Sequence, residues 1–241
     1  MPEPKQAGNG NAVSSSHLPE QRITPSMEDY LKAIYKLEHN DAPVTTQRLA
    51  DELKFSGPSV TNMIKRLNDL RLVTHNPYHG VHLTPAGQQV ALEVVRHHRL
   101  LELYLSEALG FDWDQVHAEA ELLEHHVSEE LESRMEQALG FPEFDPHGDP
   151  IPTRTGELPV RADIALTETD LDQAVIITRV SDRNPDHLRF LGEMNLRPGI
   201  ELQVIEKMPF GGPLKIRVDE IDHLIPLEVA ATIRVGSPGP G

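Results

Sequence analysis

The chain contains no cysteine in its 241 residues. This absence excludes a disulfide scaffold, a thiolate zinc finger, an iron–sulfur protein and a cysteine nucleophile. No apolar run reaches the length of about 18 residues that a membrane-spanning helix needs, so we expect no membrane partner. The N-terminal residues also lack the apolar segment of a secretory signal, so we expect a cytoplasmic protein.

Basic residues are scarce, with 22 Lys and Arg against 38 Asp and Glu, which gives a net charge of −16. Such a balance argues against a general polyanion-binding protein unless the charge is segregated. It is segregated, because residues 22–90 carry a net charge of +1, whereas residues 91–140 carry −9 and five of the 13 histidines. The acidic, histidine-rich segment indicates cation binding, and a solvated pair of acidic helices is the alternative.

The spacing of apolar and turn-forming residues predicts helices in the first part of the chain and strands in the last part. Helices are expected at 26–39, at 47–53, after Ser56, from Thr84 to Leu109, and from Val116 to Leu139 with Asp112 or Asp114 as its cap. A hairpin is expected around residues 76–79, and short strands at 175–177, 201–205, 214–218 and 231–235. Short strands at such regular spacing favour a small β-barrel.

Residues 23–90 follow the order helix, short helix, tight break, helix and hairpin, which is typical of a winged helix-turn-helix domain. An ordinary three-helix cluster with a surface hairpin is the alternative. Small hydroxyl side chains would let the third helix enter a major groove, an asparagine can pair with adenine, and basic residues can hold phosphates. The candidate DNA-contacting residues are Thr46, Arg48, Ser56, Pro58, Ser59, Thr61, Asn62 and Lys65. The small positive charge of this domain implies a dimer on two half-sites.

Two groups of metal-ligand residue types recur at helical spacing in residues 91–140. One helix face would carry His117, Glu121, Glu124 and His125, and the preceding helix would carry His98 and Glu102. Antiparallel packing would bring the two groups together, and carboxylates with imidazoles but no sulfur suit a divalent first-row ion. An isolated histidine is usually a surface or core residue, so the argument rests on the whole group.

The sequence carries none of three common catalytic signatures. It has no His-Glu-x-x-His run, no Gly-x-Ser-x-Gly elbow and no glycine-rich phosphate loop. We therefore expect no enzymatic activity.

Five motifs in order resemble the DtxR/MntR family of metal-dependent transcriptional repressors. They are Pro25-Ser-Met-Glu-Asp-Tyr-Leu, Ser56-Gly-Pro-Ser-Val, Leu83-Thr-Pro, His98-Arg-Leu-Leu-Glu and Glu121-Leu-Leu-Glu-His-His. The resemblance covers just over half of the chain. The C-terminal part is similar to the FeoA-like, Src-homology-3-like domain of the longer members, through Leu196-Arg-Pro-Gly-Ile and the alternating pattern that follows it.

The resemblance implies a homodimer whose binding to palindromic operator DNA is activated by a divalent metal. The family's primary metal site falls on Asp29, Glu121, Glu124 and His125. Its ancillary site falls on His98, Glu102 and His117, with one more ligand from the β domain, at Asp186 or His187.

Two departures from the family pattern bear on the choice of metal. Carboxylates stand at Asp29 and Glu121, where the iron-responsive members have Met and Cys, and hard oxygen ligands favour Mn(II) in relative terms. Lys32 stands where the short manganese-responsive members have a glutamate. The resemblance therefore implies a hybrid of a manganese-type primary site and an iron-type second site. We expect Mn(II) as the cofactor, Fe(II) as the alternative, and Zn(II), Co(II) or Cd(II) as substitutes in vitro.

These observations predict a mainly α chain with a small β domain. We expect a disordered tail at 1–22, a winged-helix DNA-binding domain at 23–92, a helical dimerisation and metal-binding domain at 93–142, a proline-rich linker at 143–159 and a Src-homology-3-like β-barrel at 160–236. The expected function is metal-activated repression of metal-uptake genes. A metal-independent regulator that binds an organic ligand, and a metal-dependent hydrolase or metal buffer, are the alternatives.

Overall fold

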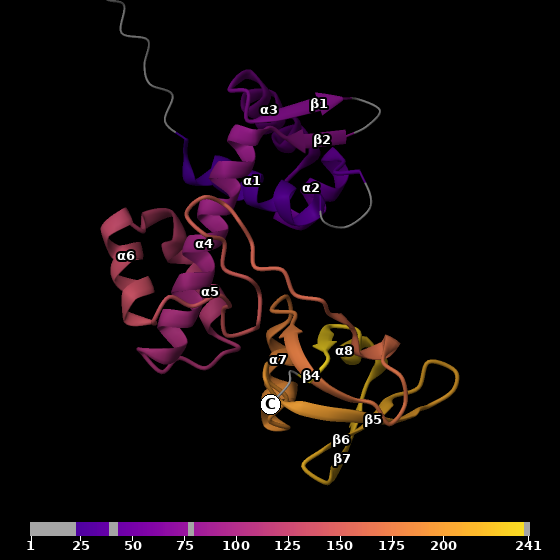
Figure 1. The fold of residues 1–241 in the computed structure, drawn as a ribbon. Helices are drawn as coiled ribbons and strands as arrows, with labels where there is room; N and C mark the ends of the chain where they lie inside the picture. The colour runs from indigo at the N-terminus through magenta and orange to yellow at the C-terminus, as the bar shows by residue number, and fades with distance from the viewer. Residues whose placement is uncertain (1–22, 39–42, 77–79, 239–241) are drawn as a thin grey trace, which may run out of the picture.

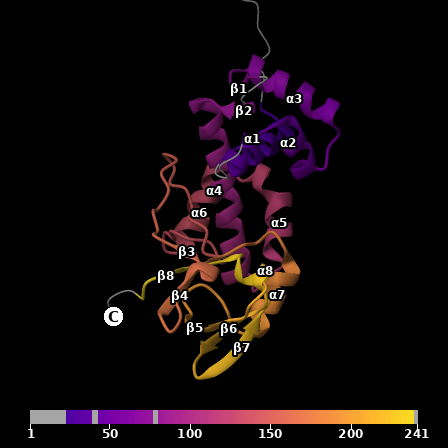
Figure 2. The same cartoon turned by 90° about the vertical axis from the view of Figure 1, so that its right-hand side faces the viewer.

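The computed structural model describes residues 23–38, 43–76 and 80–238. The predicted tail at 1–22 and the predicted hairpin turn at 77–79 lie outside the described residues. Three parts follow one another from top to bottom in Figure 2, namely a helical domain with a small hairpin, a second helical domain and a β domain. The long helix α4 begins in the first part and runs through the second (Figure 1).

The first part has the element order of a winged helix-turn-helix. Its elements are α1 (Pro25–Glu38), α2 (Thr46–Leu53), α3 (Gly57–Asp69), β1 (Val73–Asn76) and β2 (Gly80–Leu83). Thr45 caps α2, and the Ser56 hydroxyl caps α3 by accepting a hydrogen bond from the Ser59 amide. Between these helices, Lys54 takes a left-handed conformation with φ of 56°, which ends α2 sharply. The predicted helices and hairpin of this part are therefore present.

The second part is built on α4 (Pro85–Glu107), which Thr84 caps and Pro85 opens. The structure corrects the prediction of one helix from Val116 to Leu139. The segment forms α5 (Val116–Leu123), a 3-10 turn η1 (Glu124–His126) and α6 (Glu129–Ala138). Ser128 breaks the run because its hydroxyl caps α6 on the Leu131 amide, and Val127 is extended. Neither Asp112 nor Asp114 caps α5, since Gln115 occupies that position without a side-chain cap.

Residues 139–163, which include the predicted linker, have little regular structure but pack against the rest of the chain. Ile151 joins the core of the second part, and His147 is fully buried. The Val180 amide of the β domain donates a hydrogen bond to the His147 carbonyl over 2.8 Å. At Gly148, φ is +87° and a Cβ atom would lie 2.1 Å from the Thr178 carbonyl oxygen, so only glycine fits there.

The β domain is one antiparallel sheet with strand order β3-β8-β4-β5-β6-β7 around a single apolar core. Its elements are β3 (Ile164–Ala165), η2 (Leu166–Glu168), β4 (Ala174–Val180), α7 (Pro185–Glu193), β5 (Glu201–Lys207), β6 (Leu214–Val218), β7 (Ile221–Ile225), α8 (Leu227–Ala230) and β8 (Ile233–Gly236). Register shifts in β4 and β5 mark bulges, which increase the twist of a sheet. The four strands expected from the sequence correspond to β4, β5, β6 and β8, whereas β3, β7, α7 and α8 were not expected.

Trp113 connects the second part to the β domain. It lies between α4 and α5, yet its side chain is 3% exposed and belongs to the core cluster of the β domain. The Arg197 guanidinium lies 4.7 Å from the centre of its ring. No helix in the described ranges is both long enough and apolar enough to cross a membrane.

Candidate metal centre and DNA interface

The first cluster of ligand-type side chains joins α1 to the α5–η1 turn. His125 Nε2 lies 2.8 Å from Asp29 Oδ1 and 3.5 Å from Glu124 Oε1. The ligand atoms of Asp29, Glu124 and His125 all lie within 4.8 Å of one another, so a single cation can reach all three. The η1 turn permits this arrangement because it directs Glu124, which is fully buried, and His125 toward α1.

Glu121, the fourth member predicted for the primary site, lies beside this cluster in contact with Lys32. The Lys32 ammonium is 2.7 Å from Glu121 Oε1 and 2.5 Å from Glu124 Oε1. Burial opposes the charge of Lys32, but the attraction of Glu124 and Glu121 outweighs burial and raises its pKa. Lys32 therefore brings a positive charge from α1 into the acidic segment, where it lies between two carboxylates.

The second cluster is built around His98 and Glu102 of α4. His98 Nε2 lies 2.9 Å from Glu102 Oε1, and His117 Nδ1 lies 3.0 Å from the same oxygen. Asp182, which follows β4 in the β domain, completes the group with its Oδ2 atom 3.2 Å from His117 Nδ1. The residues predicted for the ancillary site are therefore brought together, and a side chain from the β domain joins them.

The side chain that the β domain places at this cluster differs from the ligand predicted there. The structure brings Asp182 to the cluster, not Asp186 or His187. Both of those residues lie on α7, where Asp186 pairs with Arg189 and is largely exposed. Among the described residues, no ligand group of three or more includes His187. Asp182 was missed because its position depends on how the β domain packs against α5, and no local sequence pattern reports such packing.

A third group shares Glu102 with the second cluster and adds Asp145 and His147 from the segment after α6. All three side chains are buried, and neither Glu102 Oε2 nor His147 Nδ1 has a hydrogen-bond partner. His147 Nε2 donates to the Trp113 carbonyl over 2.7 Å, and Nδ1 lies 3.8 Å from Glu102 Oε2. Unpartnered buried polar atoms on carboxylate and imidazole groups fit a bound cation. This group was not predicted from the sequence, and the alternation Asp145-Pro-His147-Gly-Asp149 is the local signal that could have indicated it.

His98 links the clusters into one continuous buried network. Its Nδ1 atom lies 2.5 Å from Glu124 Oε2 and its Nε2 atom contacts Glu102. Burial opposes the charged form of His98, but attraction to Glu102 outweighs burial and raises its pKa. Burial likewise opposes charge on His117, yet hydrogen bonds with Asp182 and Glu102 raise its pKa to about 10. A cation bound here must displace these protons, so its affinity rises with pH.

The predicted DNA-contacting residues lie on α2, on α3 and at Ser56 just before α3, and the two helices pack against each other. Pro58, Ser59, Asn62 and Lys65 are exposed along the N-terminal part of α3. Three of the other candidates also make contacts within the domain, since the Thr61 hydroxyl donates to the Gly57 carbonyl, Arg48 donates to the Pro43 carbonyl and Ser56 caps α3. Thr46, the eighth candidate, is half-buried at the start of α2.

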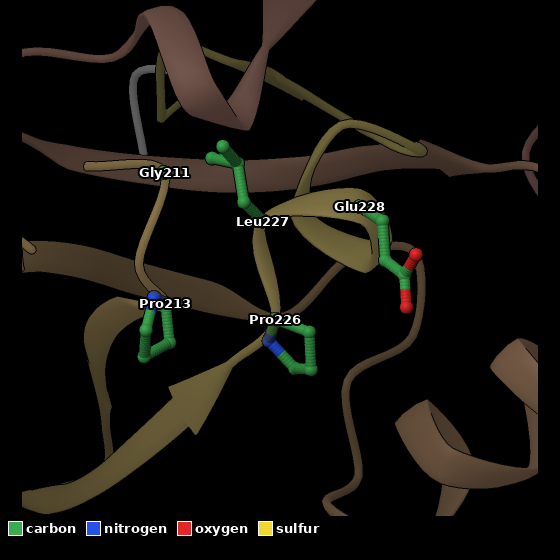
Figure 3. Close-up of a pocket in the computed structure, with 5 residues that line it drawn as sticks. All are labelled: Gly211, Pro213, Pro226, Leu227 and Glu228. Carbon is green, nitrogen blue, oxygen red and sulfur yellow. The ribbon is translucent and has the colours of Figure 1, made fainter.

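A hollow of about 410 Å³ on the β domain lies apart from these clusters (Figure 3). It is lined by Gly211, Pro213, Pro226, Leu227 and Glu228. The Leu227 side chain points toward Gly211, and the Glu228 carboxylate points the opposite way. None of the residues of the predicted linker at 143–159 lines it.

A winged helix-turn-helix whose first helix shares a cluster of carboxylates and imidazoles with a second helical domain defines a class of proteins, the metal-responsive regulators of transcription. Comparisons with known proteins agree. Family models match residues 22–81 ("Iron dependent repressor, N-terminal DNA binding domain"), 84–153 ("Iron dependent repressor, metal binding and dimerisation domain") and 164–236 ("FeoA domain").

Individual relatives carry the same assignment. The chain is 33% identical over 183 residues to the iron-dependent repressor IdeR of Mycobacterium leprae (strain TN), covering 66% of this chain and 80% of that protein. A solved manganese-dependent transcriptional repressor in complex with manganese is 34% identical, with a TM-score of 0.83 over 88% of this chain and 100% of that one. The structure of ScaR with bound Zn²⁺ is 31% identical, with a TM-score of 0.74 over 88% and 99%.

The chain belongs to the DtxR family of metal-dependent transcriptional repressors. The family resemblance and the fold class predicted from the sequence are confirmed. The names of the relatives include both iron and manganese repressors, so membership alone does not identify the ion.

Proposed function

We propose that this chain is a Mn(II)-activated repressor that binds a palindromic operator as a homodimer and represses genes of metal uptake. One observation carries the proposal. Asp29 belongs to α1 of the DNA-binding domain, whereas Glu124 and His125 belong to the helical domain, and all three offer ligand atoms to one point. Carboxylate oxygens with one imidazole, without sulfur, favour Mn(II) over softer ions in relative terms.

The residues of this chain would act by fixing the angle between its two helical parts. Bound between Asp29, Glu124 and His125, a divalent cation would supply charge neutralisation and a rigid bridge. Asp29 would hold α1, and Glu124 with His125 would hold the helical domain. With α1 fixed, the two α3 helices of a dimer would be spaced for successive major grooves of the operator. His98, Glu102, His117, Asp182, Asp145 and His147 would form a second metal-binding region that also holds the β domain.

The direct experiment is a selection of genomic DNA fragments by the chelator-stripped protein at fixed salt. Parallel selections contain chelator, Mn(II), or Fe(II) without oxygen. Enrichment of a palindromic site with Mn(II) alone supports the proposal in full. Enrichment with Fe(II) alone would identify Fe(II), and not Mn(II), as the activating ion. Equal enrichment in the chelator sample would favour a metal-independent regulator.

Asp29→Ala tests the site itself. We expect the variant to fold and dimerise but to lose Mn(II)-dependent binding to the selected DNA, because α1 loses its ligand. Electrophoretic mobility shifts at increasing Mn(II) measure the loss. The matched control is Glu93→Ala, which removes an exposed acidic side chain from α4. Unchanged Mn(II)-dependent binding by Asp29→Ala would contradict the proposed role of this site.

A further inference from the structure

Lys32 is an unusual residue for the middle of a metal-binding cluster. It is 5% exposed, and its ammonium contacts both Glu121 and Glu124 at hydrogen-bond distance. Burying an ammonium group is unfavourable unless carboxylates compensate it closely. Two carboxylates, one from α5 and one from η1, provide that compensation, so the lysine and the glutamates depend on each other.

The two glutamates are also members of a metal-ligand group. The ligand atoms of His98, Glu121 and Glu124 lie within 4.8 Å of one another, which is close enough for one cation to bind all three. The Lys32 ammonium contacts the Glu121 Oε1 and Glu124 Oε1 atoms of this same group. The remaining oxygen of Glu124 contacts His98. A positive charge carried by α1 is therefore located where this group would bind a divalent ion.

We propose that Lys32 is a tethered monovalent cation that takes the place of a second divalent ion beside the site formed by Asp29, Glu124 and His125. This inference rests on the proposed metal-dependent function. It assigns Lys32 the role of setting how many ions the first cluster binds and how tightly. With the ammonium in place, the Glu124 carboxylate is already shared with a fixed positive charge. The cluster therefore binds one ion, and it binds that ion less tightly than it would without the ammonium.

Replacing Lys32 distinguishes this proposal from a purely structural role of the ion pair. If the pair only stabilised the fold, replacing Lys32 would change the melting temperature and leave metal uptake unaltered. If the ammonium occupies a cation position, removing it lowers the repulsion felt by an incoming ion. Replacing it with a carboxylate also adds a ligand and completes a second divalent site.

The test measures Mn(II) uptake by full-length variants, using equilibrium dialysis with elemental analysis and isothermal titration calorimetry. Lys32→Glu should bind one more Mn(II) per chain than the wild type. Lys32→Gln should bind its first Mn(II) at least about tenfold more tightly, because one nearby positive charge has been removed. Lys54→Gln makes the same change at an exposed position on the DNA-binding domain and should match the wild type.

Two outcomes would overturn the proposal. One is a folded Lys32→Glu variant, judged by circular dichroism, with the wild-type number of ions. The other, decisive if Lys32→Glu does not fold, is a Lys32→Gln variant whose Mn(II) affinity equals that of Lys54→Gln. This test is independent of the DNA experiment, since the Lys32 variants can show the expected changes in Mn(II) binding even if the protein does not bind DNA. A normal DNA response with unaltered uptake would reject the role of Lys32 alone.

Discussion

Both ring nitrogens of His125 are engaged by side chains of α1. Nε2 faces Asp29, and Nδ1 lies 2.6 Å from Glu28 Oε2. A carboxylate on one imidazole nitrogen fixes the tautomer and makes the other nitrogen a better ligand. Glu28 is therefore a positioning residue, and the spacing of ligand-type residues in the sequence does not reveal such a role.

Replacing Glu28 with glutamine should weaken Mn(II) binding at the first cluster by about tenfold, since the amide orients and polarises His125 less well. Calorimetric titration of Mn(II) into the stripped protein measures the change. The control Glu93→Gln makes the same substitution at an exposed position of α4 and should have no effect. A Glu28→Gln variant with wild-type affinity would show that His125 is oriented by other contacts.

At the scale of the elements, the sequence predicts helix starts better than helix interruptions. Ser56 and Thr84 marked the starts of α3 and α4 through capping patterns that act within one turn. The break between α5 and α6 was missed because Glu124-His-His-Val contains no Pro or Gly, and only Ser128 signals a new helix. β7 was missed because only its last residue, Ile225, is buried, so its apolar pattern is weak.

In the ligand clusters, too, the sequence predicts contacts within one helix better than contacts between domains. Helical spacing placed His98 with Glu102 and grouped His117 with Glu121, because those pairs lie four residues apart on one face. Asp182, in contrast, reaches the second cluster from a separate domain, through contacts distant in sequence.

A buried ion pair connects α4 to α6 and to the segment that follows. Arg96 Nε donates to Glu132 Oε1 over 2.8 Å, and its Nη1 atom donates to the Pro152 carbonyl over 2.7 Å. Burial alone would raise the pKa of Glu132, but the hydrogen bond and charge of Arg96 outweigh burial and lower it. A carboxylate with a lowered pKa in the folded state stabilises the fold above its ordinary pKa, and that contribution is lost as the pH falls through the lowered value.

We therefore expect Glu132→Gln to lower the free energy of unfolding by about 2 kcal/mol at neutral pH. The difference from the wild type should shrink as the pH falls below the ordinary glutamate pKa of 4.5. Urea unfolding at a series of pH values measures both quantities, with Glu93→Gln as the control. A difference that stays constant into the acid range would mean that the charge of Glu132 does not contribute.

At the scale of the whole molecule, the β domain is held at several points that also belong to the ligand network. His117 pairs with Asp182, the His147 carbonyl accepts from Val180, and Gly148 lies against the Thr178 carbonyl. The clusters and the docking of the β domain therefore share residues, and loosening one should loosen the other.

Gly148→Ala tests this coupling, because its Cβ atom would lie 2.1 Å from the Thr178 oxygen and force the segment away from β4. We expect a loss of more than about 1 kcal/mol of stability and weaker Mn(II) binding at the second cluster. Thermal melting and calorimetry measure the two effects. Gly140→Ala is the matched control, since its φ is also positive, at 74°, but no atom lies within 4 Å of the added methyl group. Equal behaviour of the two variants would mean that strain at φ, and not the contact with β4, causes any loss.

Trp113 is the one tryptophan of the sequence, and its ring centre lies 5.7 Å from that of His147. Burial opposes a positive charge on His147, but attraction to Glu102, whose Oε2 atom lies 3.8 Å from Nδ1, outweighs burial and raises the pKa of the imidazole to about 9. A protonated imidazole quenches indole fluorescence, and a cation bound by His147 displaces that proton. We therefore expect the emission intensity of Trp113 to change when a cation binds this network, and its emission wavelength to change when the β domain undocks.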